Sequence, residues 1–93
     1  MIVIRYALIG RDGDGNQLAI VGTHHEPLTK HNKVAPKFHT FCLSFLALNP
    51  AVVSVDVISW QTGIDIKQAP TLLTAERTDM AGTLSYSVME VQG

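Results

Sequence analysis

Residues 2–21 read IVIRYALIGRDGDGNQLAIV, a pattern that predicts a β-hairpin near the start of the chain. Residues 2–9 are almost wholly apolar and rich in β-branched side chains, as buried strands are. A second β-prone run follows across Asp14-Gly15, and this dipeptide suits a type I′ turn, whose two central residues both need a positive φ. With those two residues as the loop, apolar side chains of the two strands fall opposite one another, Ile9 facing Ile20 and Leu8 facing Val21.

A helix is predicted after the hairpin. Apolar side chains between residues 38 and 48 recur within one arc at about 100° per residue, which indicates an amphipathic helix of about three to four turns. Asn32 is a candidate cap for its start, and Pro36 then lies in the first turn, where its missing N–H is tolerated. Asn49 can adopt the left-handed conformation that ends helices, and Pro50 prevents continuation. The residues of the apolar arc are Phe38, Phe41, Cys42, Phe45, Leu46 and Leu48.

Residues 51–60 return to the alternation expected of a strand. Residues 71–78 fit either a strand or a short helix, and their frequent threonines favour the strand. The two faces of the first segment carry Val53, Val55 and Val57 on one side, and Val52, Ser54, Asp56, Ile58 and Trp60 on the other. The sequence also predicts a break at Gly63, an irregular stretch at 64–70, a turn at 79–82 and a strand at 83–91.

The expected order of elements is ββαβ(β)β within a single domain of residues 1–93. Hairpin-type connections favour an antiparallel sheet, so we expect an α+β fold in which one amphipathic helix packs on one face of four to five strands. A chain of this length has room for one core, and a deep enclosed active site is hard to fit beside it. Because one helix covers one face, the other face or a sheet edge stays available to a partner.

Composition indicates a folded protein of a reducing compartment. Hydrophobic residues make up 46% of the chain and charged residues 16%, as in a folded domain rather than a disordered tail. Cys42 is the one cysteine and has no partner for an internal disulfide. The first residues lack a secretion-signal pattern, and no apolar run approaches the ~20 residues of a membrane helix. We therefore expect a soluble protein in the cytoplasm of a bacterial host, without a cofactor.

The net charge of −1 hides an uneven distribution. Residues 1–55 carry five Lys or Arg against three Asp or Glu, whereas residues 56–93 carry two against five. Lysines at the start of a helix are unfavourably placed beside its positive dipole end unless an anion compensates. The pattern therefore indicates a contact surface for a nucleic-acid backbone or an acidic protein patch, the alternative being a solvated lysine-bearing loop. The candidate residues of this surface are Lys30, His31, Asn32, Lys33, Lys37 and His39.

Residues 12–16 resemble the opening of a calcium-binding loop, with oxygen-bearing side chains at alternate positions. Gln17 stands where that loop needs glycine, and Thr23 stands where it needs glutamate. A strand, not a helix, is expected to follow. The segment is better explained as the turn of the hairpin.

The histidines and the cysteine form no convincing reactive site. His24 and His25 are adjacent, so on a strand they point to opposite faces and cannot hold one metal together. His39 lies one helical turn before Cys42, but a thiol on the apolar arc of a helix is a core residue and not an activated nucleophile. We expect neither a metal site nor catalysis.

The chain resembles the small phage-encoded anti-CRISPR proteins that bind type I-F surveillance complexes. The features that carry this resemblance are the predicted hairpin, the helix of residues 38–48, the basic Lys30–Lys37 segment, the single free cysteine and the lack of an enzyme motif. The resemblance implies stoichiometric inhibition, and we expect the protein to be a monomer or a homodimer. The protein would dock on Cas subunits, contact an anion such as guide RNA through Lys30, Lys33 and Lys37, and block target DNA. The modest net charge departs from strongly acidic DNA mimics.

Two other classes of function stay open. One is a small phage structural or assembly protein that acts by self-association into a ring or filament. The other is a small enzyme, which would need a bound metal ion or a reactive Cys42.

Overall fold

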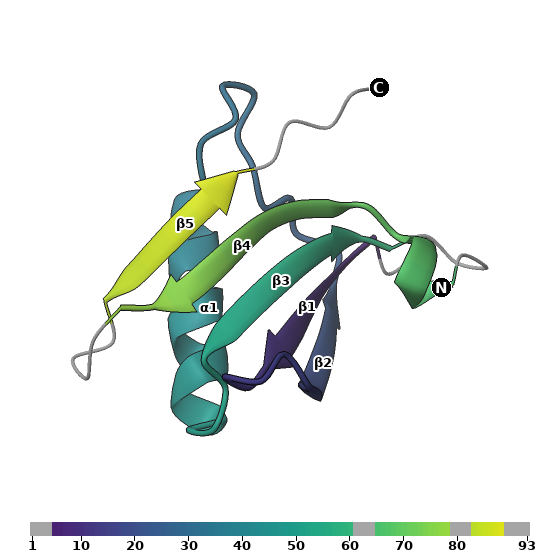
Figure 1. Ribbon diagram of the computed structural model, residues 1–93. Coiled ribbons are helices and arrows are strands. Elements are labelled where there is room, and N and C mark those ends of the chain that lie inside the picture. Colours follow the sequence, from purple (N-terminus) through teal and green to yellow (C-terminus); the bar gives the residue numbers. More distant parts are fainter. Residues whose placement is uncertain (1–4, 61–64, 79–82, 89–93) are drawn as a thin grey trace.

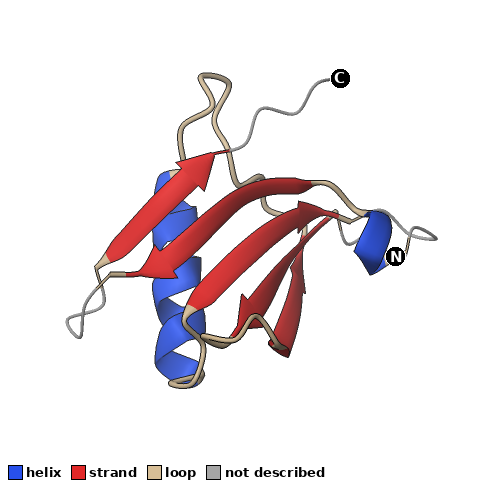
Figure 2. Cartoon of the chain, viewed as in Figure 1, coloured by secondary structure: helices blue, strands red, loops and turns tan. Residues whose placement is uncertain are grey.

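A computed structural model describes residues 5–60, 65–78 and 83–88, which form a five-stranded antiparallel sheet with a helix on one face (Figure 1). The strands lie in the order β2-β1-β3-β4-β5, and Figure 2 shows the helix crossing one side of them. The predicted α+β class and the order ββαβββ are confirmed, and the segment predicted as strand or helix at 71–78 is a strand over residues 71–77. The elements are β1 (Tyr6–Arg11), β2 (Gln17–Thr23), α1 (Pro36–Leu48), β3 (Ser54–Ser59), the 3-10 turn η1 (Ile66–Gln68), β4 (Thr71–Arg77) and β5 (Leu84–Val88).

Some predictions fall on residues that the structure does not describe. These are the start of the first strand at residues 2–4, the break at Gly63, the turn at 79–82 and the end of the last strand at residues 89–91. Within the described ranges, no helix combines the length and the apolar character that crossing a membrane demands.

The first hairpin has the predicted register but a different turn. Ile9 pairs with Ile20 and Leu8 with Val21, as expected. The two-residue type I′ turn is wrong, because the loop spans residues 12–16 and Gly15, with a φ of 86°, is the one residue of this loop with a positive φ. The Asp12 carboxylate accepts hydrogen bonds from the backbone N–H groups of Asp14 and Asn16, both at 2.9 Å, and so closes the wider loop. An irregularity in pairing between Gly10 and Arg11 absorbs the difference in length.

The helix has its predicted length but different caps. It begins at Pro36, which occupies the first helical position, and its N-cap is Ala35 rather than Asn32. Asn32 has a φ of 61° and lies in a separate tight turn before Ala35, so it does not cap the first turn of α1. Asn49 ends the helix with a φ of −130°, not in the left-handed region, and its side-chain Nδ2 donates to the Phe45 carbonyl at 2.8 Å.

The main core lies between α1 and the sheet. Phe38, Cys42, Phe45 and Leu46 of the helix are at most 5% exposed and pack on apolar side chains of the strands. Gly10 of β1 lets the helix approach closely, because a Cβ atom there would lie 2.5 Å from the Phe45 ring. The strand-side and connecting residues of this core are Leu8, Val52, Val55, Val57, Leu73 and Ala75.

Val52 packs in this core, although strict alternation placed it on the opposite face. The reason is that β3 begins only at Ser54, so residues 51–53 belong to the turn from the helix and do not follow strand alternation. Val53 is correspondingly 45% exposed.

The face of the sheet away from α1 is partly covered. Ala7, Ile9 and Ile58 are at most 3% exposed there, and Trp60 together with Ile66 of η1 packs over them. Further along the same face, Arg11 pairs with Asp56 at 2.8 Å, and Thr74 donates to the other Asp56 oxygen at 2.9 Å. The side chains that cover this face leave less of it open to a partner than one helix alone would imply.

Candidate functional site

The predicted basic residues divide among three places. Lys30, His31, Asn32 and Lys33 lie on a small hairpin that we call the basic hairpin, residues 28–34, closed by a β-bridge between its two ends. The Thr29 hydroxyl accepts hydrogen bonds from two backbone N–H groups of the loop, at 3.3 and 3.2 Å. All four side chains are exposed, and the basic hairpin projects beyond the N-terminal end of α1 (Figure 1).

Lys37 and His39 lie on opposite sides of α1, because residues two positions apart in a helix are rotated by about 200° around its axis. Lys37 faces the β2 side, where it lines a hollow with His25 and Glu26. His39 faces the β5 side, where its ring meets the Tyr86 ring edge-on at a centroid distance of 4.8 Å. The six residues therefore do not form one continuous patch.

The outer edge of the sheet beside this helix is β2. In the part of the chain that the structure describes, β2 pairs only with β1, so its other edge lies at the margin of the sheet. Residues 17–23 carry no charged side chain. Leu18, Ile20 and Val21 are 47%, 37% and 49% exposed, so β2 presents apolar side chains as well as an unpaired strand edge.

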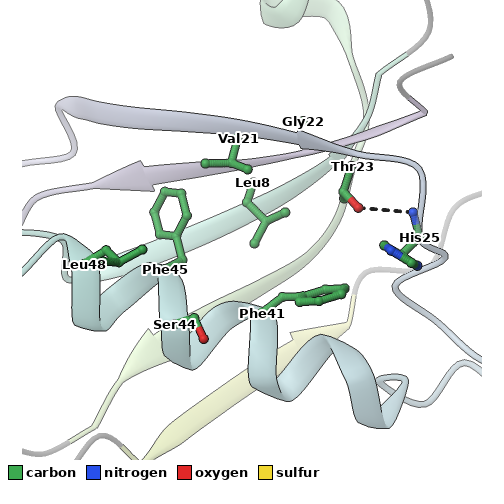
Figure 3. Close-up of a pocket in the computed structure, with 9 residues that line it drawn as sticks. All are labelled: Leu8, Val21, Gly22, Thr23, His25, Phe41, Ser44, Phe45 and Leu48. Atoms are coloured by element: carbon green, nitrogen blue, oxygen red, sulfur yellow. Dashed lines mark hydrogen bonds between the residues drawn. The ribbon is translucent and has the colours of Figure 1, made fainter. Parts of the chain in front are cut away.

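A groove of about 320 Å³ runs between β2 and α1 (Figure 3). Val21 and Thr23 point from β2 toward the helix, Phe45 points from α1 toward the strand, and the Phe41 ring extends toward His25. Leu48 is 81% exposed and closes one end. We call this hollow the edge groove; it is lined by Leu8, Val21, Gly22, Thr23, His25, Phe41, Ser44, Phe45 and Leu48.

A second hollow continues from the edge groove toward the start of α1. It shares His25 and Phe41 with the edge groove, and Lys37 and Glu26 bring charge to its wall. The His25 ring lies 5.1 Å from the Phe41 ring, and the His25 backbone N–H donates to the Thr23 hydroxyl at 3.1 Å. We call this second hollow, of about 460 Å³, the lysine end of the groove.

Glu26 already has a hydrogen-bond partner. Its carboxylate accepts from the Tyr6 hydroxyl at 3.0 Å. Partial burial and this acidic neighbour raise the pKa of Tyr6, so the phenol stays protonated and keeps donating at neutral pH.

Cys42 and Tyr86 lie together under the other side of α1. Cys42 is 0% exposed, and burial raises the pKa of its thiol from 9.0 to about 11. Burial also raises the pKa of Tyr86. A thiol held neutral in apolar surroundings is a poor nucleophile and a poor metal ligand.

The histidines are arranged by ring packing. His24 stacks on His25 with ring centroids 4.6 Å apart, and His25 continues to Phe41. Among the described residues, no three His, Cys, Asp or Glu side chains gather closely enough to hold a metal ion. The Asp12 carboxylate, which begins the calcium-like stretch, accepts hydrogen bonds from its own loop, and these lower its pKa.

Comparisons with models of known protein families, with curated proteins and with solved structures each found no match.

Sequence reasoning did not find the edge groove. It assigned Phe41 and Leu48 to the core with the rest of the apolar arc, but Phe41 is only partly buried and Leu48 is largely exposed. The signal that was present is the spacing: Lys37, Phe41, Ser44 and Leu48 follow one another at four, three and four residues and so share one side of a helix. We call this row the β2-facing stripe of α1.

Proposed function

We propose that this protein is a non-enzymatic binding protein that meets its partner through the outer edge of β2 and the neighbouring side of α1. The observation that carries the proposal is an uncharged edge strand beside an apolar groove. Exposed strand edges recruit other chains by completing backbone hydrogen bonds, and apolar hollows beside them select side chains.

Most of β2 lacks the features that usually protect an edge strand. Edge strands of stable monomers are usually protected by lysines, prolines or bulges. Residues 17–23 contain no lysine and no proline, and the irregular pairing lies at the start of the strand, which leaves residues 19–23 regular. Such an edge is suited to pairing with a partner chain when the protein functions.

The test is capture of a partner by edge variants. Tagged protein is incubated with a bacterial lysate, and bound material is identified by mass spectrometry and checked for RNA. Ile20→Lys places a charge on β2, whereas Ser85→Lys places the same charge on the opposite edge strand, where the wild-type side chain is also exposed. We expect wild type and S85K to retain the same partner and I20K to lose it. Equal retention by I20K would remove β2 from the contact.

The resemblance to type I-F anti-CRISPR proteins makes the proposal more specific. The partner would be a CRISPR–Cas surveillance complex in the cytoplasm of a bacterial host, and the inhibitor would block its binding of target DNA. The basic hairpin supports a contact with guide-RNA phosphates, because this segment extends beyond the N-terminal end of α1 (Figure 1) and its residues Lys30 and Lys33 are exposed.

A gel-shift assay tests the inhibitor. Purified type I-F complex is given labelled target DNA with and without a stoichiometric amount of this protein. Wild type should abolish the shift. The triple reversal of Lys30, Lys33 and Lys37 to Glu should restore the shift without changing the thermal unfolding of the protein. Inhibition that survives the reversal would exclude the lysines from the mechanism. A lack of inhibition by wild type would refute the proposal that the protein inhibits this complex.

Self-association is the second candidate, and β2 is the observation that favours it. β2 of one copy can pair with β5, at the other margin of the described sheet, of a second copy without bringing like charges together, and such a head-to-tail contact repeats into a ring or filament. Light scattering after size exclusion at micromolar concentration distinguishes the two. A ring or filament supports a phage assembly protein, whereas a monomer or dimer supports the binding protein.

A further inference from the structure

The edge groove also indicates what kind of segment it takes, an inference that rests on the proposed function. We infer that the occupant is an extended peptide segment of a partner protein. It adds to the outer edge of β2 in antiparallel fashion, places apolar side chains at alternate positions in the edge groove, and holds a carboxylate beside Lys37 at the lysine end.

The geometry of strand addition brings side chains into the groove. Val21 and Thr23 point toward α1, and an added strand lies about 4.8 Å from β2 with its own side chains alternating in the same way. Residues of the segment opposite Val21 and Thr23 therefore also point toward α1, over Phe41, Ser44 and Leu48. The alternate side chains of the segment, opposite Ile20 and Gly22, point to the other face of the sheet and are exposed to solvent.

The dimensions of the groove suit a single strand. Alternate residues of a strand are about 6.6 Å apart, and the eight residues from Phe41 to Leu48 cover about 10 Å along the helix axis. Two side chains of the segment therefore fit along this side of α1. The volume of about 320 Å³ is small for a helix or a folded domain and sufficient for a pair of aliphatic side chains.

Charge complementarity indicates that the end of the segment beside Lys37 carries an acidic residue. Lys37 lies at the second position of α1, where the helix dipole adds positive potential, and the stretch from Pro27 to Val55 contains no acidic residue. Glu26 is the acidic residue of this wall; it keeps its negative charge while its carboxylate accepts from the Tyr6 hydroxyl, and within the described part of the chain it makes no ion pair with Lys37. Because β2 runs from the Leu48 end to the lysine end (Figure 3), an antiparallel segment begins at the lysine end, and its carboxylate lies near its N-terminus.

A second copy of this chain fits the groove less well. If β2 pairs with itself about its midpoint, Ile20, Ala19 of the second copy lies opposite Val21. Ala19 is too small to fill an apolar hollow, and the irregular pairing of Gln17 and Leu18 interrupts the regular strand opposite Thr23. A different segment, apolar at both of these positions, fills the same space.

Selection from a display library of random peptides of about nine residues, slightly longer than β2, tests the inference. The full-length protein is immobilised, and enriched peptides are sequenced. We expect apolar residues at alternate positions with an acidic residue on their N-terminal side. No enrichment over a blank surface, or enrichment of peptides with helical spacing or basic ends, would overturn the inference.

Variants then locate the enriched peptide. Leu48→Glu should weaken its binding at least tenfold, whereas Leu43→Glu, at a 43% exposed leucine that does not line the groove, should leave binding within twofold. Lys37→Glu should shift the selected peptides from acidic to basic ends. Amide NMR shifts on adding the enriched peptide should centre on β2 and residues 37–48, and shifts confined to the other sheet edge would contradict the site.

The two proposals fail in different ways. If capture from the lysate depends on Ile20 but the library yields no alternating acidic peptide, the binding function stands and the inferred occupant is wrong. If the library yields that peptide but capture is unchanged in I20K, the groove binds such segments and the proposed functional contact is wrong.

Discussion

Gly10 permits the close contact between α1 and the sheet, so Gly10→Ala should destabilise the protein. The added Cβ would lie 2.5 Å from Phe45 Cε1 and 2.9 Å from Val52 Cγ2, whereas carbon atoms prefer separations of about 3.5–4.0 Å. The neighbours must therefore yield by roughly 1 Å. Phe45 and Val52 are 5% and 1% exposed, so neither can turn into solvent without leaving the core.

The expected loss of stability follows from two opposing effects. Overpacking a core costs about 1–3 kcal/mol, and a site with two crowded neighbours belongs near the upper end. Replacing glycine by alanine within a strand returns about 0.5–1 kcal/mol. The net loss is about 2 kcal/mol, which lowers the melting temperature of a domain of this size by about 8–16 °C.

Urea unfolding followed by circular dichroism measures this loss, with Gly13→Ala as the matched control. Gly13 lies in the exposed hairpin loop and has no atom within 4 Å of an added Cβ, so its substitution should change stability by less than about 0.5 kcal/mol. Phe45→Leu combined with Gly10→Ala should cost less than the sum of the two single changes, because the smaller side chain relieves the crowding. If Gly10→Ala proves as stable as wild type, the packing of Phe45 over β1 is refuted.

Three further predictions concern the same fold. The Arg11–Asp56 pair is partly exposed, at 35% and 22%, so a double-mutant cycle should give a coupling of about 0.5–1 kcal/mol that shrinks with added salt; a coupling insensitive to salt would contradict an ion pair. The folded state raises the pKa of Cys42 above its ordinary value, so the neutral thiol contributes stability fully below about pH 9, and this contribution is lost as the pH rises toward about 11. Urea titrations should show that loss, and Cys42→Ala should remove the part that begins near pH 9. On α1, Leu46→Ala should cost about 2–5 kcal/mol because Leu46 is 4% exposed, whereas Leu48→Ala, at 81% exposure, should stay within about 0.5 kcal/mol; equal losses in thermal melts would show that the helix is rotated from the position described.

Features that depend on local periodicity could be predicted from the sequence. The register of β1 with β2 follows from apolar residues at alternate positions, since a slip by one residue would turn every one of them to the wrong face. The extent of α1 follows from apolar residues at helical spacing and from Pro36 and Pro50 at its two ends.

Features that depend on side-chain hydrogen bonds were not predictable in the same way. The Asp12 carboxylate holds a five-residue loop where Asp14-Gly15 alone indicated a two-residue turn. Thr29 organises a tight turn that places Asn32 at a positive φ and away from the start of α1. Each choice depends on which competing partner a polar group finds.

The candidate site shows the same division. Closeness in sequence grouped the basic residues, but helical geometry separates Lys37 from His39, and the hairpin carries Lys30 and Lys33 away from both. The apolar arc was correctly predicted to face the core, but Leu48 at its end was wrongly assigned to the core. Periodicity shows in which direction a side chain points and does not show how far the sheet extends beneath the helix.

The sequence by itself determined which segments are strands and which is the helix, because apolar residues recur with the strand or helix period over short stretches of sequence. Only the tertiary structure decided that β2 lies at one margin of the described sheet, since this follows from β1 pairing with β3 across more than forty residues. The position of α1 over the sheet then decided that a groove opens beside that edge. Long-range strand pairing and helix placement therefore determine which surfaces remain open, because they depend on contacts between segments far apart in the chain.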